Sequence, residues 1–212
     1  MINKKIEEYA EEHSSPEDEV LYDLNRKTHL NVVRPKMLSG HLQGRLLQMI
    51  SEMLKPQRIL EIGTYTAYST ICLGRGLAGD GKIITIEKNP ELETMIRDYI
   101  AKAGLKDKTI LEIGDAMQIL PRLEDSFDLA FIDADKENYI AYYDMIKPKI
   151  RKGGYILADN ALWYGKVIDP TQETDRETAG ITAFNEYVQE DTDVENLLLP
   201  FRDGIMIMKK VV

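Results

Sequence analysis

Hydrophobic and polar positions follow two alternating patterns from about residue 58 onward. Short, almost uniformly apolar runs each end in Gly, Asp, Asn or Glu, and uniform runs of this kind are typical of parallel strands buried on both faces. The five runs are Arg58–Gly63, Lys82–Glu87, Thr109–Asp115, Phe127–Asp135 and Gly153–Asn160.

Stretches with helical spacing of apolar residues lie between these runs. They predict helices over Tyr68–Ala78, Pro90–Ala103 and Glu137–Ile150, the second with a proline near its start. Repeated strand, helix, strand segments predict an α/β fold with a doubly wound, mostly parallel, Rossmann-like sheet.

The C-terminal part has a different pattern. Two strand-like runs, Glu195–Leu199 and Gly204–Lys210, are joined by only Pro-Phe-Arg-Asp, and Thr178–Glu190 precedes them as a predicted helix. Parallel neighbours need a connection of about a dozen residues or more, so this pair should be an antiparallel hairpin.

The first 55 residues are expected to be mostly helical. Ser39–Leu54 is predicted to be a helix with one apolar face, formed by Leu42, Leu46, Ile50, Met53 and Leu54 at helical spacing. Asn31–Leu38 is expected to be a loop. We interpret residues 1–55 as a helical N-terminal cap on a Rossmann-like core of residues 56–212, within one domain.

Net charge and cysteine content disfavour some classes of function, such as DNA binding. The 212 residues carry a formal net charge of −9, which disfavours DNA binding because phosphate contacts need a basic surface. The single cysteine, Cys72, excludes an intrachain disulfide and fits a cytoplasmic location. Neither a signal peptide nor a membrane-spanning run of apolar residues is expected.

Acidic residues and a glycine follow the first three predicted strands, at the edge where open α/β sheets bind ligands. Gly63 either allows the backbone to turn tightly next to a ligand or is a structural turn residue with no ligand. Without a G-x-G-x-x-G motif, a nicotinamide dehydrogenase is disfavoured. Glu87 could hold ribose hydroxyls or be solvated, and Asp115 could hold an adenine amino group or cap a helix. Together they favour an adenosine site.

A second polar cluster follows the next two strands. Asp133 ends the fourth, and Asp159 and Asn160 end the fifth. Two carboxylates and an amide oxygen suit Mg²⁺ better than zinc, unless the acids only cap the segments that follow. Lys136 is either a surface lysine or a base whose pKa is lowered near a dication.

Several motifs together resemble one enzyme family. They are MLSGHLQGRLL (37–47), LEIGTYTAYS (60–69), TIEKNP (85–90), GDA (114–116), FIDADKENY (131–139), ADNALWYGKV (158–167) and LPFRDGIMIMKK (199–210). The chain resembles, over nearly its whole length, the cation-dependent O-methyltransferases that use S-adenosylmethionine and include the catechol and caffeoyl-CoA enzymes. One departure is Ala67, where relatives usually carry glycine; its methyl would lie close to the methionine moiety.

The resemblance implies a role for each matching residue. Glu61, Gly63, Tyr65 and Ser69 would line the methionine part of S-adenosylmethionine, Glu87 its ribose, Asp115 and Ala116 its adenine, and Met37 and Asp133 would complete the cofactor site. Asp133, Asp159 and Asn160 would bind Mg²⁺ or another divalent cation such as Mn²⁺ or Ca²⁺. Lys136 would be the base, and Trp163 would wall the substrate pocket unless it fills the core. A homodimer through the N-terminal helices is also implied.

The implied reaction is methyl transfer to one hydroxyl of an acceptor with two neighbouring oxygens. Either a catechol-like small molecule or the wobble 5-hydroxyuridine of a tRNA satisfies this requirement. Basic residues before the core would grip tRNA phosphates, or are simply solvated; they are Arg26, Lys27, Arg34, Lys36 and Arg45. A catalytically silent cofactor-binding protein is a further alternative, disfavoured by the intact metal and base set.

Overall fold

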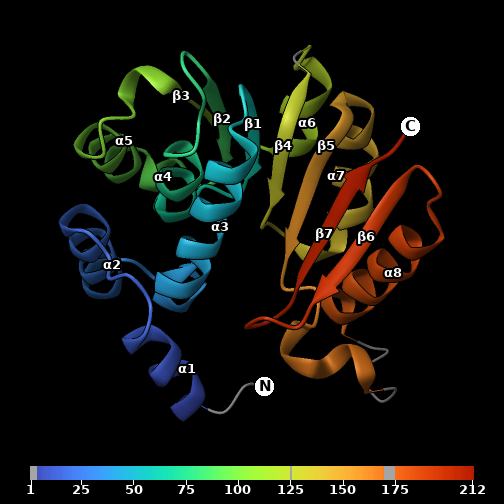
Figure 1. Ribbon diagram of the computed structural model, residues 1–212, viewed down its shortest axis with the longest axis horizontal. Helices are drawn as coiled ribbons and strands as arrows, with labels where there is room; N and C mark the ends of the chain where they lie inside the picture. Colours follow the sequence, from blue (N-terminus) through green and yellow to red (C-terminus); the bar gives the residue numbers. More distant parts are fainter. Residues whose placement is uncertain (1–3, 125, 170–174) are drawn as a thin grey trace. The chain divides into compact units, whose positions relative to one another are not determined.

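The computed structural model describes residues 4–124, 126–169 and 175–212 (Figure 1). The chain forms two compact units, one ending at Asp115 and one running from Ala116 to Val212. We call them the N-terminal unit and the C-terminal unit and describe each by itself.

Three parallel strands form the sheet of the N-terminal unit, as predicted. They are β1 (Arg58–Ile62), β2 (Lys82–Glu87) and β3 (Thr109–Ile113), in the order β3-β2-β1. Ile62 pairs with Ile86, and Glu87 pairs with Ile113. The segments that follow the three strands therefore meet at the same edge of this sheet, where the predicted adenosine-site residues lie.

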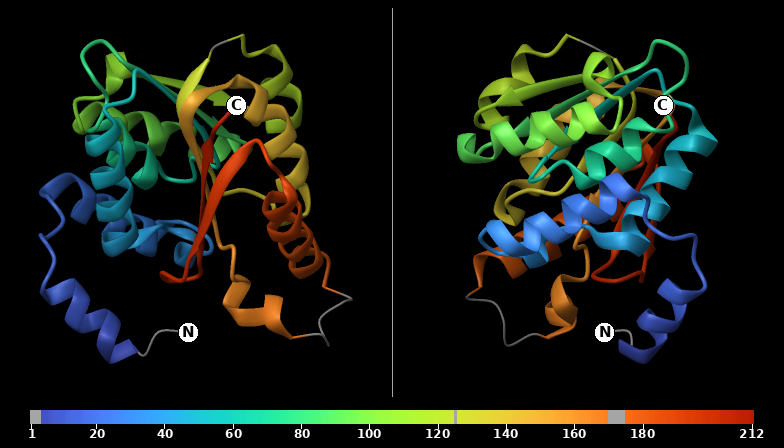
Figure 2. Two further views of the ribbon diagram at one scale, coloured as in Figure 1. Left: turned by 45° about the vertical axis from the view of Figure 1, so that its right-hand side comes forward. Right: turned by 90° about the vertical axis from the view of Figure 1, so that its left-hand side faces the viewer.

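Helices make up most of the rest of this unit (Figures 1 and 2). They are α1 (Lys4–Glu12), α2 (Glu19–Asn31), α3 (Gly40–Leu54), α4 (Tyr68–Gly74) and α5 (Glu93–Lys102), with 3₁₀ turns at Pro35–Met37, Pro90–Leu92 and Lys106–Lys108. The helix predicted to reach Ala78 ends earlier. Its next residues turn toward β2, with the Ala78 amide donating to the carbonyl of Pro56 at 3.0 Å.

The apolar face predicted for α3 is not its buried face. The buried residues are Gln43, Gly44, Leu47 and Ser51. A Cβ on Gly44 would lie 2.4 Å from a ring carbon of Tyr68, so the absence of a side chain lets α3 approach α4 closely. Small residues, which apolar spacing ignores, therefore set the orientation of α3.

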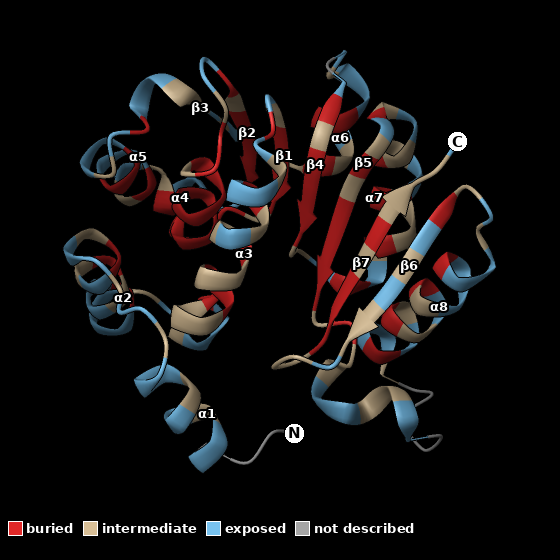
Figure 3. Cartoon of the chain, in the orientation of Figure 1, coloured by how far each residue is buried: buried red, intermediate tan, exposed pale blue. Residues whose placement is uncertain are grey.

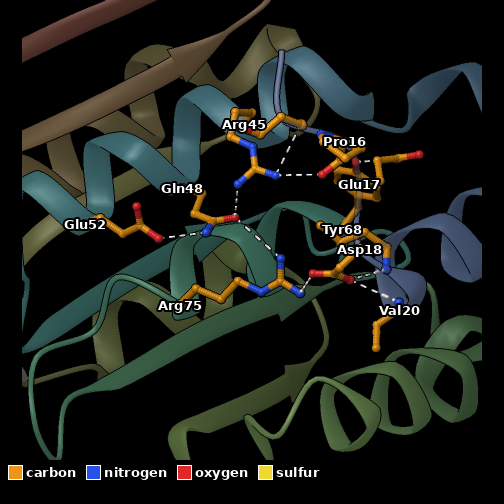
Figure 4. A network of polar contacts seen from close by, with 11 residues as sticks. Pro16, Glu17, Asp18, Val20, Arg45, Gln48, Glu52, Tyr68 and Arg75 are labelled. Atoms are coloured by element: carbon orange, nitrogen blue, oxygen red, sulfur yellow. Dashed lines mark hydrogen bonds and ion pairs between the residues drawn. The ribbon is translucent and has the colours of Figure 1, made fainter. Parts of the chain in front are cut away.

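A polar network connects the segment between α1 and α2 to helices α3 and α4 (Figure 4). Asp18 caps α2 by accepting from two backbone amides and pairs with the guanidinium of Arg75. Arg45 of α3 donates to the carbonyl of Pro16 at 2.9 Å. Arg45, one of the five candidate phosphate contacts, is therefore used by the fold itself.

The C-terminal unit holds a four-stranded sheet in the order β4-β5-β7-β6. Its strands are β4 (Phe127–Ile132), β5 (Ile150–Asp159), β6 (Val194–Leu199) and β7 (Ile205–Lys210). Strands β4 and β5 are parallel, and β7 runs antiparallel to both β5 and β6, which confirms the predicted hairpin. Strand β5 begins before the predicted Gly153, which has a φ of +75° next to an irregularity in the β4–β5 pairing.

Helices α6 (Ala116–Ile119), α7 (Tyr139–Ile146) and α8 (Arg176–Glu190) belong to the same unit. Its 3₁₀ turns are Leu120–Arg122, Lys136–Asn138, Lys147–Lys149 and Trp163–Ile168. Figure 3 shows β4 almost entirely buried. The rings of Tyr139 and Tyr143 on α7 meet Phe184 of α8 edge to face, at centroid distances of 5.4 and 6.1 Å. This aromatic cluster holds the two helices together.

Within the described ranges, no helix has the length and apolar character needed to cross a membrane.

Candidate active site

The turn from β1 to α4 is built from left-handed backbone conformations. Gly63 has a φ of +95°, Tyr65 of +51° and Ala67 of +74°. Ala67 is fully buried, and an L-residue in this region costs about 1–2 kcal/mol relative to the right-handed conformation. Glycine adopts this conformation freely. The main consequence of alanine at position 67, in place of the family's usual glycine, is therefore backbone strain.

Glu87 lies at the end of β2 beside this turn. It is 8% exposed, which rules out a solvated acid. Its carboxylate accepts from the backbone amide of Tyr65 at 2.7 Å and from that of Asn89 at 2.8 Å. Burial raises the pKa of Glu87 above its usual value, although these donors act in the opposite direction. A carboxylate thus faces the glycine turn, as an adenosine site requires.

Glu61 and Ser69 are both buried within the N-terminal unit. The Glu61 carboxylate accepts from the hydroxyl of Thr85 on β2 at 2.6 Å and from that of Thr70 on α4. Because Glu61 itself lies on β1, it connects β1 and β2 to α4 and stabilises the turn between β1 and α4.

The remaining candidates for the adenosine end are less enclosed. Asp115 pairs with Lys88 at 3.5 Å, and its side chain is 36% exposed. Ala116 is the buried first residue of α6, and Met37 is exposed at the end of the 3₁₀ turn before α3. The hydroxyl of Tyr65 donates to backbone carbonyls of the segment that carries Met37, the nearer being that of Arg34 at 3.2 Å.

In the C-terminal unit, strand register brings the predicted metal ligands together. Ile132 pairs with Ala158 on the neighbouring parallel strand, so the next residues of the two strands, Asp133 just after β4 and Asp159 at the end of β5, lie at the same edge of the sheet. Asp159 is 5% exposed, and one of its carboxylate oxygens accepts from the backbone amide of Asn160 at 2.8 Å. Asn160 itself has a φ of +58°.

This donor set fits a hard cation. Carboxylate and amide oxygens are the ligands that Mg²⁺, Mn²⁺ and Ca²⁺ take in proteins. Among the residues that the structure describes, no group of three or more His, Cys, Asp or Glu side chains could hold a metal ion. A site at this edge would therefore depend on the amide of Asn160 as its third protein ligand.

Lys136 is 5% exposed, so it is not a surface lysine. Its Nζ donates to Asp133 at 2.9 Å and to the hydroxyl of Tyr139 at 2.7 Å. Burial lowers the pKa of Lys136, but the neighbouring Tyr139, Asp133 and Asp159 raise it more, and the result lies above the ordinary value. Without a cation, the neighbouring Tyr139, Asp133 and Asp159 therefore keep Lys136 as an ammonium. The lowered pKa was expected only beside a bound dication and stays a prediction.

Tyr139 is a residue that the sequence interpretation missed. Its hydroxyl also lies 3.2 Å from the carbonyl of Asp159 and 3.3 Å from that of Ile132. It therefore accepts from Lys136 and donates to the backbone at the ends of β4 and β5. Its position three residues after Lys136 is the signal that could have revealed it.

The indole of Trp163 lies near the Lys136 side chain of this cluster. The Nζ of Lys136 lies 5.8 Å from the centroid of its ring. The side chain is half-buried, and its Nε1 has no hydrogen-bond partner among the described residues. This position, unlike that of a core side chain, allows the indole to wall a substrate pocket.

Comparisons with known proteins identify the family of this chain. The sequence matches the O-methyltransferase family over residues 11–211. The chain belongs to this family. It is therefore an enzyme of the O-methyltransferase class, and its Rossmann-like methyltransferase fold is the one that the strand pattern and the motifs predicted.

Two relatives and one solved structure show the extent of the similarity. The probable caffeoyl-CoA O-methyltransferase 2 of Dictyostelium discoideum is 31% identical over 99% of this chain and 93% of its own. The catechol O-methyltransferase of Niastella koreensis is 35% identical over 74% of this chain and 72% of its own. The chain also resembles the O-methyltransferase TomG from Streptomyces achromogenes, whose crystal structure was solved in complex with SAM. The two structures superpose with a TM-score of 0.92 at 28% sequence identity, and the match covers 100% of each chain.

Proposed function

We propose that this O-methyltransferase transfers a methyl group from S-adenosylmethionine to one hydroxyl of a catechol-like small molecule, with the help of a divalent cation. The observation that carries the proposal is the cluster of Asp133, Lys136 and Asp159 at the ends of β4 and β5. The relatives named for catechol and caffeoyl-CoA point to acceptors with two adjacent hydroxyls, and TomG is a relative with SAM bound.

The N-terminal unit would bind the cofactor. The carboxylate of Glu87, already surrounded by backbone donors, would accept from the ribose hydroxyls, and the left-handed turn at Gly63 would let the chain approach the methionine moiety. The other residues that we assign to the cofactor are Met37, Glu61, Tyr65, Ser69, Asp115, Ala116 and Asp133.

Asp133, Asp159 and Asn160 would hold the cation, with Mg²⁺ as the first choice and Mn²⁺ or Ca²⁺ as alternatives. A cation bound there would supply Lewis acidity, lowering the pKa of an acceptor hydroxyl and favouring acceptors with two neighbouring oxygens. A cation beside Asp133 and Asp159 would offset the carboxylates that keep Lys136 as an ammonium, so that this lysine, held in place by Tyr139, would take the acceptor proton. The indole of Trp163 would pack against the acceptor ring. Alignment of the acceptor with the methyl group is worth up to about 7–11 kcal/mol in favourable cases.

A tRNA nucleoside is a second candidate acceptor, favoured by one observation. Arg26, Arg34 and Lys36 are all exposed before the core of the N-terminal unit. Exposed basic side chains can grip phosphates and position a nucleic acid without reading its bases.

We also propose that the chain forms a homodimer through its N-terminal helices and works in the cytoplasm. Apolar side chains remain exposed on two of these helices: Ile6 and Tyr9 on α1 are about three-fifths exposed, and Met49 and Met53 on α3 are 52% and 73% exposed. Sedimentation of the protein at micromolar concentration should give twice the mass of the chain. A monomer under these conditions would contradict the dimer.

A methyl-transfer assay tests the proposed activity. The protein is incubated with S-adenosylmethionine and MgCl₂ and with 3,4-dihydroxybenzoate, 4-hydroxybenzoate or a tRNA that carries unmethylated 5-hydroxyuridine. The products are identified by mass spectrometry. We expect methylation of the dihydroxy acid, none of the monohydroxy acid, and loss of activity with EDTA. Methylation of the tRNA alone would establish the second candidate. Equal rates with and without EDTA would rule out the cation.

A further inference from the structure

We infer that Asp203, in the turn between β6 and β7, is a positioning residue that orients the amide of Asn160 toward the cation. This inference rests on the proposed metal site and adds a residue that does not itself touch metal, cofactor or acceptor. Asp203 lies 43 positions after Asn160, so no local motif links the two residues.

The contacts of Asp203 converge on the loop that follows β5. One carboxylate oxygen accepts from the Nδ2 of Asn160 at 3.3 Å, and the other accepts from the backbone amide of Tyr164. Its own carbonyl accepts from the amide of Leu162 at 2.8 Å. Asp203 therefore contacts the loop after β5 at three separate residues.

The close approach of the two segments is built into the backbone. Gly204 has a φ of +86°, and a Cβ at this position would lie 2.7 Å from the backbone nitrogen of Leu162. The carbonyl of Gly204 accepts from the amide of Ala161 at 3.0 Å. Glycine after Asp203 thus allows the turn to lie directly against the loop.

The loop needs such support because its backbone is strained. Asn160, Trp163 and Tyr164 have φ values of +58°, +44° and +55°. Non-glycine residues in this region persist only where the surrounding contacts over-determine the conformation, and they concentrate at functional sites. Asp203 supplies side-chain contacts to two of these three residues.

The chemistry of the contact selects one end of the Asn160 amide. An ionised carboxylate only accepts hydrogen bonds, so Asp203 can bind the NH₂ end and not the oxygen end. The oxygen of the amide is then the end available to a cation, and only this end can act as a ligand. An asparagine at position 203 could pair with either end and would lose the selection.

A Mn²⁺ titration tests the inference. Trp163 is the only tryptophan of the chain, so its fluorescence reports binding of MnCl₂ at the cluster, and calorimetry gives an independent dissociation constant. We expect Asp203→Asn to weaken Mn²⁺ binding by about 10–100-fold, the usual effect of losing a partner behind a metal ligand. The matched control is Asp193→Asn, which removes a carboxylate of the same unit that pairs with Lys147 at 3.1 Å. It should change the affinity less than twofold.

A double variant separates orientation from loss of charge. In an Asn160→Asp background, both ends of the side chain at position 160 are oxygens, so presenting an oxygen to the cation needs no selection by residue 203. Asp203→Asn should therefore weaken Mn²⁺ binding by about 10–100-fold when residue 160 is asparagine and far less when residue 160 is aspartate. A mere loss of charge would weaken binding by the same factor in both backgrounds and would overturn the inference.

The remaining outcomes are equally decisive. Wild-type affinity in Asp203→Asn would overturn the inference and leave the metal site standing. If the wild-type chain binds S-adenosylhomocysteine but no Mn²⁺, the proposed metal site is wrong, and the inference falls with it. If Asp203→Asn does not fold, recovery of folding and Mn²⁺ binding in the double variant supports the inference, and no recovery overturns it.

Discussion

The hydroxyl of Tyr139 lies 2.7 Å from the Nζ of Lys136 and holds this buried ammonium beside Asp133. The same hydroxyl lies 3.2 Å from the carbonyl of Asp159, so it connects the lysine to the end of β5. Lys136 is thereby fixed between a carboxylate and a phenol instead of reaching toward solvent. A position of this kind suits a residue that must meet one atom of an acceptor.

Tyr139→Phe should therefore slow methyl transfer while leaving cofactor binding unchanged. The variant removes one acceptor of Lys136, and leaving a buried donor unsatisfied costs about 1–3 kcal/mol. We expect a roughly tenfold lower kcat, because about 1.4 kcal/mol corresponds to one factor of ten, with an unchanged affinity for S-adenosylhomocysteine. The control is Tyr143→Phe, on the same helix, whose hydroxyl donates to Asp191 at 2.8 Å. Equal turnover in the two variants would contradict the role of Tyr139.

Replacement of Lys136 tests the base directly. Lys136→Ala should lower the methyl-transfer rate by about 10²–10⁴, the range for a positioned acid–base group. Lys136→Arg should not restore the rate, because a guanidinium stays protonated and cannot take the acceptor proton. Stopped-flow or single-turnover measurements with a saturating catechol separate this step from product release. A wild-type rate in Lys136→Ala would show that the lysine is not the base.

Glu87 should give the protein a characteristic pH dependence. Because burial raises the folded-state pKa of this acid, its ionisation opposes folding. The contribution of Glu87 is therefore most favourable below its usual value of 4.5 and declines as the pH rises from there through the raised pKa. Glu87→Gln lacks this titration, so its stability relative to wild type should increase with pH across that window.

Urea unfolding of both proteins at pH 4, 5, 6 and 7 measures this difference. Affinity for S-adenosylhomocysteine should change in the opposite sense, weakening as the pH falls, because the ribose hydroxyls donate to the ionised carboxylate. A stability difference that does not vary with pH would mean that Glu87 keeps its ordinary pKa.

The sequence predicted those parts of the fold that depend on local periodicity. The strand runs and the short Pro-Phe-Arg-Asp connection were enough to define the sheets and the hairpin, because apolar periodicity and connection length are local properties. The buried face of α3 was predicted wrongly because Gly44 and Ser51 are buried for their small size, which depends on the neighbouring helix.

The candidate site divides in the same way. Asp133 and Asp159 could be placed together because both end predicted parallel strands. The contact of Asp203 with Asn160 could not be foreseen, since the register of the hairpin against the loop is a property of the folded chain. Nor could the raised pKa of Lys136, which depends on carboxylates that folding brings together.

Ala67→Gly should stabilise the protein. The alanine adopts a φ of +74°, and removing a side chain from a left-handed position relieves strain of about 1–2 kcal/mol, partly offset by the greater flexibility of glycine in the unfolded chain. We expect a higher thermal midpoint. The control, Ala183→Gly, lies at an exposed interior position of α8 and should destabilise by about 1 kcal/mol. Parallel losses in both variants would mean that residue 67 is not strained.

Gly180 of α8 should tolerate no side chain, because the helix packs there against the turn that carries Lys136. A Cβ on Gly180 would lie 2.7 Å from the carbonyl oxygen of Lys136 and 3.0 Å from the Cα of Glu137. Both are backbone atoms, so the contact can be relieved only by moving the turn or the helix. Overpacking of this kind typically costs about 1–3 kcal/mol, more than the roughly 1 kcal/mol that alanine gains over glycine in a helix.

Gly180→Ala should therefore lower both stability and turnover. A displacement near 1 Å at a reacting group can cost about 10²-fold in rate, so kcat should fall well beyond the loss of folded protein. Affinity for S-adenosylhomocysteine should not change, since none of the proposed cofactor contacts involves Lys136 or Glu137. Thr182→Ala, two residues along the same helix, also raises helix propensity and should keep wild-type turnover. Wild-type kcat in Gly180→Ala would show that the turn absorbs the methyl group without moving Lys136.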